Sequence, residues 1–286
     1  MKSGFRVFLA AFLALGLSWC GFVLAPVNQL GTARQAAVLN SSDLYPLQRT
    51  GEATLGLQVY RANGCAACHT EQVRQDGVMC EVVLTDLGKN GAAISNALVG
   101  IEELMHKENP ENEHIGVSSE KIYHKVSKTI ADSISDEIAA AGGKTEIHIV
   151  PVGVDIARGW GVRRSVAADF LYDAPVQLGS LRAGPDLANI GLRYPDLNWQ
   201  LVHLYAPQAV VKNSAMPAFR YLFELRKHID GVSSPDALKL PQAFAPPAGY
   251  EVVPTPEGRQ LAAYLLSLKT DAPLYEAPFT SVMTKP

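Results

Sequence analysis

The sequence predicts a mostly α-helical protein that begins with a single transmembrane helix and whose helical domain is interrupted by a small α/β domain. Three observations predict this organisation: an uncharged apolar run near the N-terminus, two amphipathic helical segments far apart in the chain, and a stretch between them where strand and helix patterns alternate. The composition, with 48% hydrophobic and 19% charged residues, excludes a collagen-like, rod-like or mostly disordered chain.

Charge and cysteine content exclude two further classes. Lys plus Arg number 25 and Asp plus Glu number 28, which gives a net charge of -3. The chain therefore has no broad basic field that would hold nucleic acid. Four cysteines in 286 residues are also too few for a disulfide scaffold.

The N-terminal residues 1–30 are predicted to anchor the protein in a membrane. Lys2 and Arg6 precede the uncharged run Val7–Ala25, which ends at Pro26. As a helix this run would measure about 28 Å, close to the thickness of a bilayer's hydrocarbon core. Because the basic residues come first, we expect a single-pass protein of the bacterial inner membrane with the rest of the chain in the periplasm. A cleaved signal peptide is the alternative, although no small-x-small cleavage site follows cleanly.

The strongest chemical motif is Cys65-Ala66-Ala67-Cys68-His69, a C-x-x-C-H pattern typical of covalent haem attachment. One helical turn brings two thiols to the two vinyl groups of one porphyrin, and the next residue can present its imidazole to the iron. A thioredoxin-like C-x-x-C is the alternative, but its βαβ surroundings are missing from the pattern. Half a zinc site would need a second Cys/His pair at short spacing, and none follows. The motif predicts one covalently bound haem c.

Two amphipathic segments are predicted to pack around this motif. Gly56 and Tyr60 lie one turn apart before it, and Gly56 would let another helix approach closely. The candidate partner is a helix from Pro256 to Leu268, which Thr255 can cap and whose Pro256 suits the first helical position. Alternatively, the two segments are ordinary amphipathic helices that do not pack against each other around the motif.

The haem iron also needs a sixth ligand or an open position, and the chain has five methionines. We predict Met216 as this ligand, because its neighbour Pro217 fixes the backbone and Ser214 and Ala215 permit close approach. Alternatively, Met216 only fills the hydrophobic core. The sixth position of the iron would then be open, or His203 would occupy it. His/Met ligation would raise the reduction potential and leave no position for oxygen, which favours electron transfer.

Read together, these segments resemble the mono-haem subunit II of cbb3-type cytochrome c oxidases, over residues 1–75 and 155–270. Besides the anchor and the C-x-x-C-H motif, the segments that carry the resemblance are Gly159-Trp160-Gly161-Val162-Arg163-Arg164-Ser165, Tyr172-Asp173, Leu178 through Leu187, Gly191-Leu192-Arg193-Tyr194, Trp199 through Leu204, and Ser214-Ala215-Met216-Pro217.

The resemblance implies a class I cytochrome c fold with haem ligands Cys65, Cys68, His69 and Met216. Iron coordination would come from His69 and Met216. In class I cytochromes a proline carbonyl at the place of Pro185 accepts a hydrogen bond from the haem-ligating imidazole; an ordinary Gly-Pro-Asp turn is the alternative. Arg182 is a candidate partner for a haem propionate, or else a solvated surface residue. The implied partners are a haem-copper catalytic subunit and a donor cytochrome c.

Residues 76–154 depart from that family and are predicted to form an inserted α/β domain. Met79–Leu84 is predicted to be a buried strand and Thr145–Val150 a second one. Between them we expect a helical stripe through Ile94, Leu98, Ile101 and Met105, and a helix capped by Ser118 or Ser119 whose face is Ile122, Val126, Ile130, Ile134 and Ile138. Gly142-Gly143 would end that helix. The domain faintly resembles the carboxy-terminal domain of the bacterial ribosomal stalk protein.

The predicted function is the transfer of single electrons to the haem-copper centre of a terminal oxidase in aerobic respiration, without a complete active site in this chain. The alternatives are an anchored cytochrome of another respiratory complex, such as nitric oxide reductase, and a haem-based sensor with the insert as output module. The Pro-rich segment 226–255 is predicted to be an extended excursion. The tail 271–286 is predicted to be irregular and to wrap the surface or a neighbour.

Overall fold

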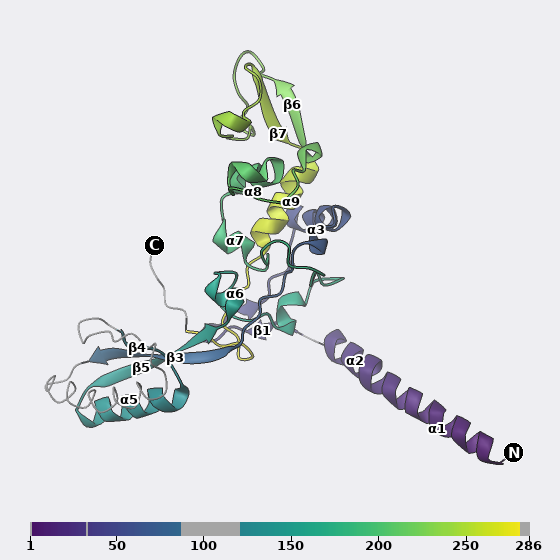
Figure 1. Ribbon diagram of the computed structural model, residues 1–286, viewed down its shortest axis with the longest axis vertical. Coiled ribbons are helices and arrows are strands. Elements are labelled where there is room, and N and C mark those ends of the chain that lie inside the picture. Colours follow the sequence, from purple (N-terminus) through teal and green to yellow (C-terminus); the bar gives the residue numbers. More distant parts are fainter. Residues whose placement is uncertain (1, 33, 87–120, 281–286) are drawn as a thin grey trace.

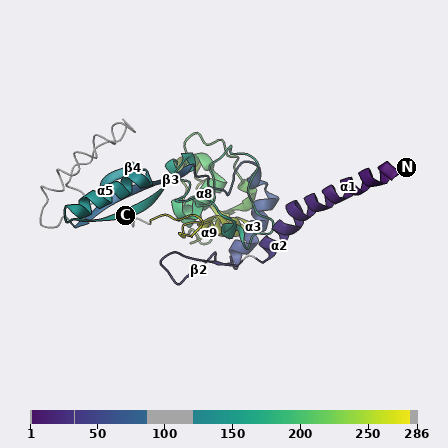
Figure 2. The same cartoon turned by 90° about the horizontal axis from the view of Figure 1, so that it is seen from below.

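The computed structural model describes residues 2–32, 34–86 and 121–280. Figure 1 shows a long N-terminal helix, a central part that contains α3, α7, α8 and α9, and an α/β part that contains β3, β4, β5 and α5. We call the second part the helical unit and the third the α/β unit. The long helix and the α/β unit leave the helical unit on opposite sides (Figure 2).

The N-terminal helix consists of α1 (Lys2–Trp19), a π-helical turn (Cys20–Leu24) and α2 (Ala25–Gly31). The uncharged run ends at Pro26, and the helix continues through this residue to Gly31, close to the predicted end of the anchor at residue 30. Proline lacks an N–H and crowds the carbonyl one turn earlier. The preceding turn is widened instead, and the Ala25 N–H donates to the Cys20 carbonyl. By length and composition, Gly4–Gln29 could cross a membrane, which agrees with an anchor.

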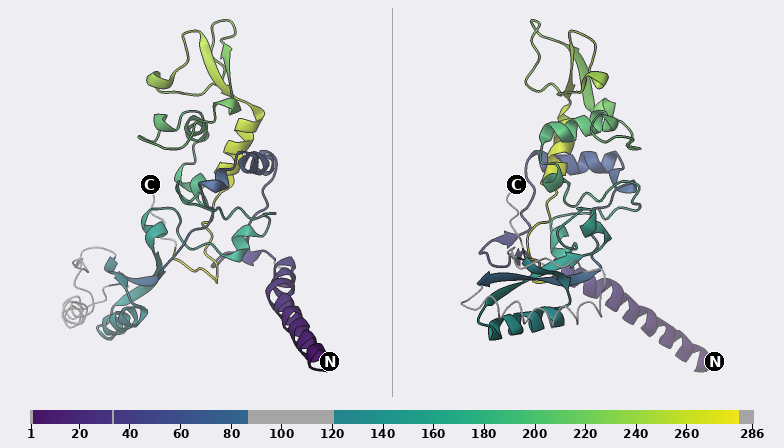
Figure 3. Two further views of the ribbon diagram at one scale, coloured as in Figure 1. Left: turned by 45° about the vertical axis from the view of Figure 1, so that its right-hand side comes forward. Right: turned by 60° about the vertical axis from the view of Figure 1, so that its left-hand side comes forward.

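The helical unit is built on the crossing of α3 (Glu52–Ala62) and α9 (Pro256–Ser267), which lie side by side in Figure 3. A Cβ atom added to Gly56 would lie 1.9 Å from the Gln260 carbonyl oxygen, so only glycine permits this approach. The rings of Tyr60 and Tyr264 meet at 5.1 Å between centroids. Thr255 caps α9, as predicted, by accepting the Gly258 N–H.

Two shorter helices complete the core of the helical unit. These are α7 (Ile190–Arg193) and α8 (Leu197–Tyr205), and both contact α9. Asp196 caps α8 by accepting the backbone N–H groups of Asn198 and Trp199. The buried core combines distant parts of the chain: Tyr60, Leu187, Ile190, Leu201, Leu204, Leu222, Leu261 and Leu265. Single helical turns connect these elements: Cys65–Ala67, Val154–Ala157 (α6), Ala167–Phe170, Pro207–Ala209, Arg220–Leu222 and Gln242–Phe244.

The Pro-rich excursion is bounded by a hairpin that we did not predict. β6 (Phe223–Lys227) pairs antiparallel with β7 (Tyr250–Pro254), from Phe223 opposite Pro254 to Lys227 opposite Tyr250. The buried carboxylate of Glu251 closes the loop at its base by accepting from Ser233, Ser234 and Arg226. Pro235, Pro241, Pro246 and Pro247 therefore lie in the connection between the two strands, and β7 leads directly into α9.

The α/β unit is a three-stranded antiparallel sheet with the strand order β4-β3-β5. Its elements are β3 (Gly77–Asp86), β4 (Lys121–Val126), α5 (Lys128–Ala140) and β5 (Lys144–Val152). Both predicted strands lie within β3 and β5. The core cluster between sheet and helix consists of Cys80, Val82, Val126, Ala131, Ile134 and Ile138.

The predicted helix of this unit begins later than expected. Residues 121–126 form a strand, and α5 starts after Ser127, whose Oγ accepts the Ile130 N–H at 3.4 Å. The spacing of Ile122 and Val126 misled the prediction because four residues are both about one helical turn and two strand repeats. The helix ends as predicted, with Gly142 at a φ of 90°. The stripe from Ile94 to Met105, and Ser118 and Ser119, lie outside the described residues.

The C-terminal segment runs from α9 along the helical unit to the α/β unit. The Ala272 carbonyl accepts from Arg163 Nε at 2.6 Å, and the Glu276 carbonyl accepts from Arg164 Nη2 at 2.6 Å. The Thr280 N–H donates to the Ile149 carbonyl of β5 at 3.0 Å. A small hydrophobic cluster lies near the start of this C-terminal segment and consists of Val166, Leu274 and Ala277. It packs against the two-residue strands β1 (Ala36–Ala37) and β2 (Leu44–Tyr45).

Candidate functional site

The C-x-x-C-H motif lies in a tight turn directly after α3. Gly64 has a φ of 67°, a conformation that suits glycine and lets the chain leave the helix. The N–H groups of Cys68 and His69 both donate to the Cys65 carbonyl, at 3.1 and 3.0 Å. Cys65 is half-buried and Cys68 is exposed. Burial raises the pKa of the Cys65 thiol to about 11, so this thiol is neutral at physiological pH.

The imidazole of His69 is oriented by the segment from Gly184 to Leu187. His69 Nδ1 lies 2.8 Å from the Pro185 carbonyl oxygen, the partner that the sequence predicted. A carbonyl only accepts, so Nδ1 carries the proton and Nε2 is left with its lone pair for a metal. A Cβ on Gly184 would lie 2.2 Å from His69 Cε1, so the glycine lets the backbone rest against the ring.

Backbone pairing holds this segment against the residues that follow the cysteines. The Gly184 N–H donates to the Cys68 carbonyl at 2.9 Å, and the Leu187 N–H donates to the Thr70 carbonyl at 2.7 Å. These two bonds lie on either side of Pro185, so the position of its carbonyl is set from both ends.

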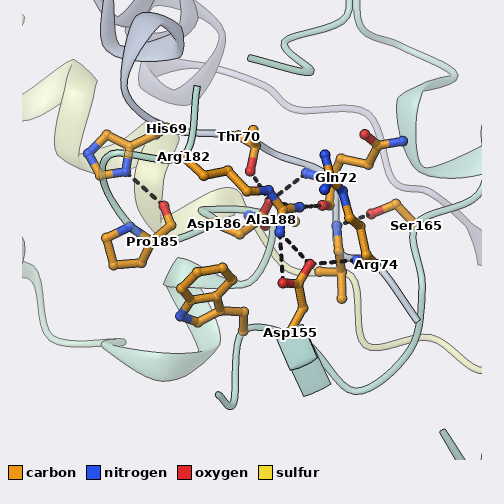
Figure 4. A network of polar contacts seen from close by, with 12 residues as sticks. His69, Thr70, Gln72, Arg74, Asp155, Ser165, Arg182, Pro185, Asp186 and Ala188 are labelled. Atoms are coloured by element: carbon orange, nitrogen blue, oxygen red, sulfur yellow. Dashed lines mark hydrogen bonds and ion pairs between the residues drawn. The ribbon is translucent and has the colours of Figure 1, made fainter. Parts of the chain in front are cut away.

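A buried polar network continues from this pairing (Figure 4). Asp186 accepts from the Thr70 hydroxyl, from the Gln72 N–H at 2.8 Å and from the Ala188 N–H at 2.9 Å. Arg182 Nη1 donates to both carboxylate oxygens of Asp155, at 2.7 and 2.6 Å, and Nη2 donates to the Gln72 carbonyl. The predicted propionate role of Arg182 stays a prediction, but this guanidinium already binds protein groups. Sequence reasoning missed Asp155, because nothing in the local pattern links it to Arg182.

Met216 lies in the irregular segment before the hairpin, where its N–H donates to Ser214 Oγ at 3.3 Å. Its side chain is half-buried and packs against the same hydrophobic core as Cys65 and Ala66. The structure therefore brings the Met216 segment and the cysteine turn to one core, although they are far apart in the sequence.

An aromatic stack borders the site on α8. Tyr194 and Trp199 stack at 3.8 Å between ring centroids, and Trp199 and His203 stack at 4.9 Å. Burial and the neighbouring His69 lower the pKa of His203 to about 4, so this imidazole is neutral at physiological pH. Its Nδ1 is buried without a hydrogen-bond partner among the described residues. The sequence named His203 as an alternative ligand but did not predict the stack.

The arrangement fits a covalently bound haem in three respects. Two cysteines one turn apart precede an imidazole whose Nε2 is available as a ligand, and a methionine thioether packs on the same core. Seven buried side-chain polar atoms lack partners among the described residues, and three of them lie around the His69 segment: Arg182 Nε, Arg193 Nε and His203 Nδ1. Unpaired buried polar groups are uncommon and are often satisfied by a group that binds there.

Comparison with protein families finds a match between part of the chain and a family of cytochrome c oxidase subunits. The family that matches is described as Cytochrome C oxidase, mono-heme subunit/FixO, and the match covers residues 148–251. It includes Arg182, Pro185, His203 and Met216, whereas the C-x-x-C-H motif precedes it. This match confirms the resemblance to the mono-haem subunit of the cbb3-type oxidase. The family implies one haem and association with an oxidase complex. No curated protein matches the chain.

Proposed function

We propose that this protein is a membrane-anchored c-type cytochrome that passes single electrons to the haem-copper subunit of a cbb3-type terminal oxidase. The observation that carries the proposal is the orientation of His69. Its Nδ1 is held by the Pro185 carbonyl directly after two cysteines at haem-attachment spacing. The match to the oxidase subunit family over residues 148–251 supports the same acceptor.

In this proposal Cys65 and Cys68 would hold the haem by thioether bonds, and His69 Nε2 and Met216 Sδ would bind its iron. When bound, a haem with His and Met ligands supplies a one-electron carrier of raised potential. The protein's own residues would orient the iron ligand and exclude water from the haem. Pro185 fixes the tautomer and raises the basicity of His69, and the hydrophobic core behind Cys65 and Met216 excludes water.

The proposal assigns residues 1–30 to the anchor, 31–75 and 155–270 to the cytochrome c domain, 76–154 to the insert and 271–286 to the tail. The haem domain would lie in the periplasm of a bacterium, outside the inner membrane. There it would receive electrons from a donor cytochrome c. The apolar helix Gly4–Gln29 supports the anchor, and the two basic residues at its start support this orientation.

The ligand set is tested by expressing the full chain with a c-type maturation system and recording spectra in detergent. Wild type should carry one covalent haem and show the weak long-wavelength absorbance of a sulfur-to-iron bond. Met216→Ala should keep the haem and lose that absorbance. Met79→Ala, which changes a methionine of β3, is the matched control and should leave it unchanged. Binding of carbon monoxide by reduced wild type would contradict the electron-transfer function and favour a sensor.

The acceptor is tested by purification in mild detergent through a tag after Pro286. Recovery of a multispanning subunit with b-type haem and oxygen uptake is the expected result. A partner that reduces nitric oxide and not oxygen would overturn the oxidase assignment. Mass spectrometry of the same sample shows whether residues 1–30 are retained, which separates an anchor from a cleaved signal peptide.

A further inference from the structure

The α/β unit is joined to the helical unit at a narrow neck next to the polar network. The chain leaves at Asp76 and returns at Gly153, and the Asp76 N–H donates to the Val152 carbonyl at 2.8 Å. Gly153 has a φ of 151°, and a Cβ there would lie 2.8 Å from the Asp76 nitrogen. The return point is therefore held in one conformation, and it places Asp155 two residues further on, in α6.

Asp155 is a buried carboxylate at this return point, with 3% of its surface exposed. It accepts from the Arg74 N–H at 2.8 Å and from Arg182 Nη1 with both oxygens. The Arg182 guanidinium also lies 5.7 Å above the Trp160 ring and 3.6 Å from Asp186. This half-buried guanidinium, held on several sides by planar and charged partners, has little freedom to move.

Arg182 and Asp186 stand on either side of Pro185. Arg182 is fixed by Asp155 from the neck, and Asp186 is fixed by Thr70 and Gln72 from the residues after the cysteines (Figure 4). The Pro185 carbonyl that orients His69 thus lies between two charged side chains, Arg182 and Asp186, that are both fixed by hydrogen bonds. The partner of Arg182, Asp155, lies directly after the end of the α/β unit.

We propose that Asp155 and Arg182 are positioning residues for the haem-ligating imidazole of His69, and that the return point of the α/β unit thereby sets the properties of the haem site. This inference rests on the proposed haem ligation. Asp155 places a buried negative charge near the site, and such a charge stabilises the ferric form of the haem. The geometry restrains the Pro185 carbonyl, and the charge lowers the reduction potential.

The test compares the haem-loaded wild type with Asp155→Asn, Arg182→Lys and Asp132→Asn. Asp132 lies on α5, pairs with Lys128 on the surface and takes no part in the network, so Asp132→Asn removes the same charge from the α/β unit as a control. The readouts are the reduction equilibrium measured against a mediator of fixed potential and the exchange rate of the His69 Nδ1–H by NMR.

Asp155→Asn should raise the equilibrium constant for reduction by about threefold or more and should speed the His69 Nδ1–H exchange. Arg182→Lys keeps the charge and loses the planar fork, so it should speed the exchange about tenfold with a smaller change in the reduction equilibrium. Asp132→Asn should match wild type in both. If Asp155→Asn fails to accumulate, Arg182→Lys decides the question through the exchange rate.

The outcomes separate this inference from the proposed function. A wild type without covalent haem would overturn both. A wild type with His/Met-ligated haem whose two network variants behave like Asp132→Asn would overturn only the positioning role. Faster exchange in both network variants, together with an unchanged control, would establish it.

Discussion

The helical unit and the α/β unit bury their side chains in different ways. The core of the α/β unit is a compact set of aliphatic residues and one thiol, all packed between one sheet and α5. The helical unit joins residues from Tyr60 to Leu268 in one core and buries several charged groups beside it, among them Glu71, Asp155, Arg163 and Asp186. Among the described residues the α/β unit buries one charged side chain, that of Glu81, whereas the helical unit buries several around its candidate cofactor site, where oriented polar groups are needed.

The largest expected effect is at the helix crossing. Gly56→Val should destabilise the helical unit by more than about 3 kcal/mol, because the new side chain would overlap the Gln260 carbonyl, a backbone atom that cannot turn away. Thermal unfolding of the detergent-solubilised protein, followed by the sulfur-to-iron absorbance, measures this. Gly77→Ala in the α/β unit is the control, since its Cβ would meet only Val152 Cγ2 at 4.0 Å. Similar losses in the two variants would contradict the comparison.

The independence of the α/β unit is tested in its own core. Ile134 is fully buried, and Ile134→Ala should cost about 3 kcal/mol through lost contacts and a residual cavity. If the unit folds by itself, this loss should appear in the hydrogen exchange of β3 and β5. The thermal unfolding transition followed by the haem absorbance should then keep its wild-type midpoint temperature. A shift of the haem transition by the same amount would show one cooperative unit instead.

The buried charge of the helical unit should be visible in its pH dependence. Glu71 is 3% exposed and accepts from the Tyr264 hydroxyl, and burial raises its pKa to about 8. Between its ordinary pKa and about 8, the folded protein holds a proton that the unfolded chain has released. The stability from this group is therefore complete at low pH and is lost as the pH rises through about 8.

Wild type should lose about 2 kcal/mol more than Glu71→Gln between about pH 6 and 8, because glutamine keeps a hydrogen-bond acceptor and does not ionise. Urea unfolding across this range measures the difference. Glu146→Gln on the exposed side of β5 is the matched control and should follow wild type. Parallel curves for wild type and Glu71→Gln would show that Glu71 does not carry the effect.

The smallest expected effects come from the helix caps, one in each unit. Ser127→Ala removes the acceptor at the start of α5, and Thr255→Ala removes the one at the start of α9. Each should cost about 1 kcal/mol. The Ser127 variant should weaken only the hydrogen exchange protection of the α/β unit, and the Thr255 variant only that of the helical unit. Loss in both units from either variant would argue against separate cores.

Local features of this protein could be predicted from the sequence because neighbours in the chain set them. Four such features depend only on residues within one or two turns of the chain. They are the C-x-x-C-H spacing, the Thr255 cap with Pro256, the Gly142 helix exit and the strand from Met79 to Leu84. The apolar N-terminal helix follows from composition alone, although its passage through Pro26 does not. The residues 121–126 show the limit, because their spacing suits a helix and a strand equally well.

By itself, the sequence determined the C-x-x-C-H motif, the start of α9, the end of α5 and the apolar N-terminal segment, since these follow from periodicity and spacing. Only the tertiary structure decided that Asp155 holds Arg182, that Gly184 rests on the His69 ring and that β4 pairs with β3. Each of these depends on a partner brought near by the fold, and a pattern along the chain specifies which face is buried but not which group lies against it.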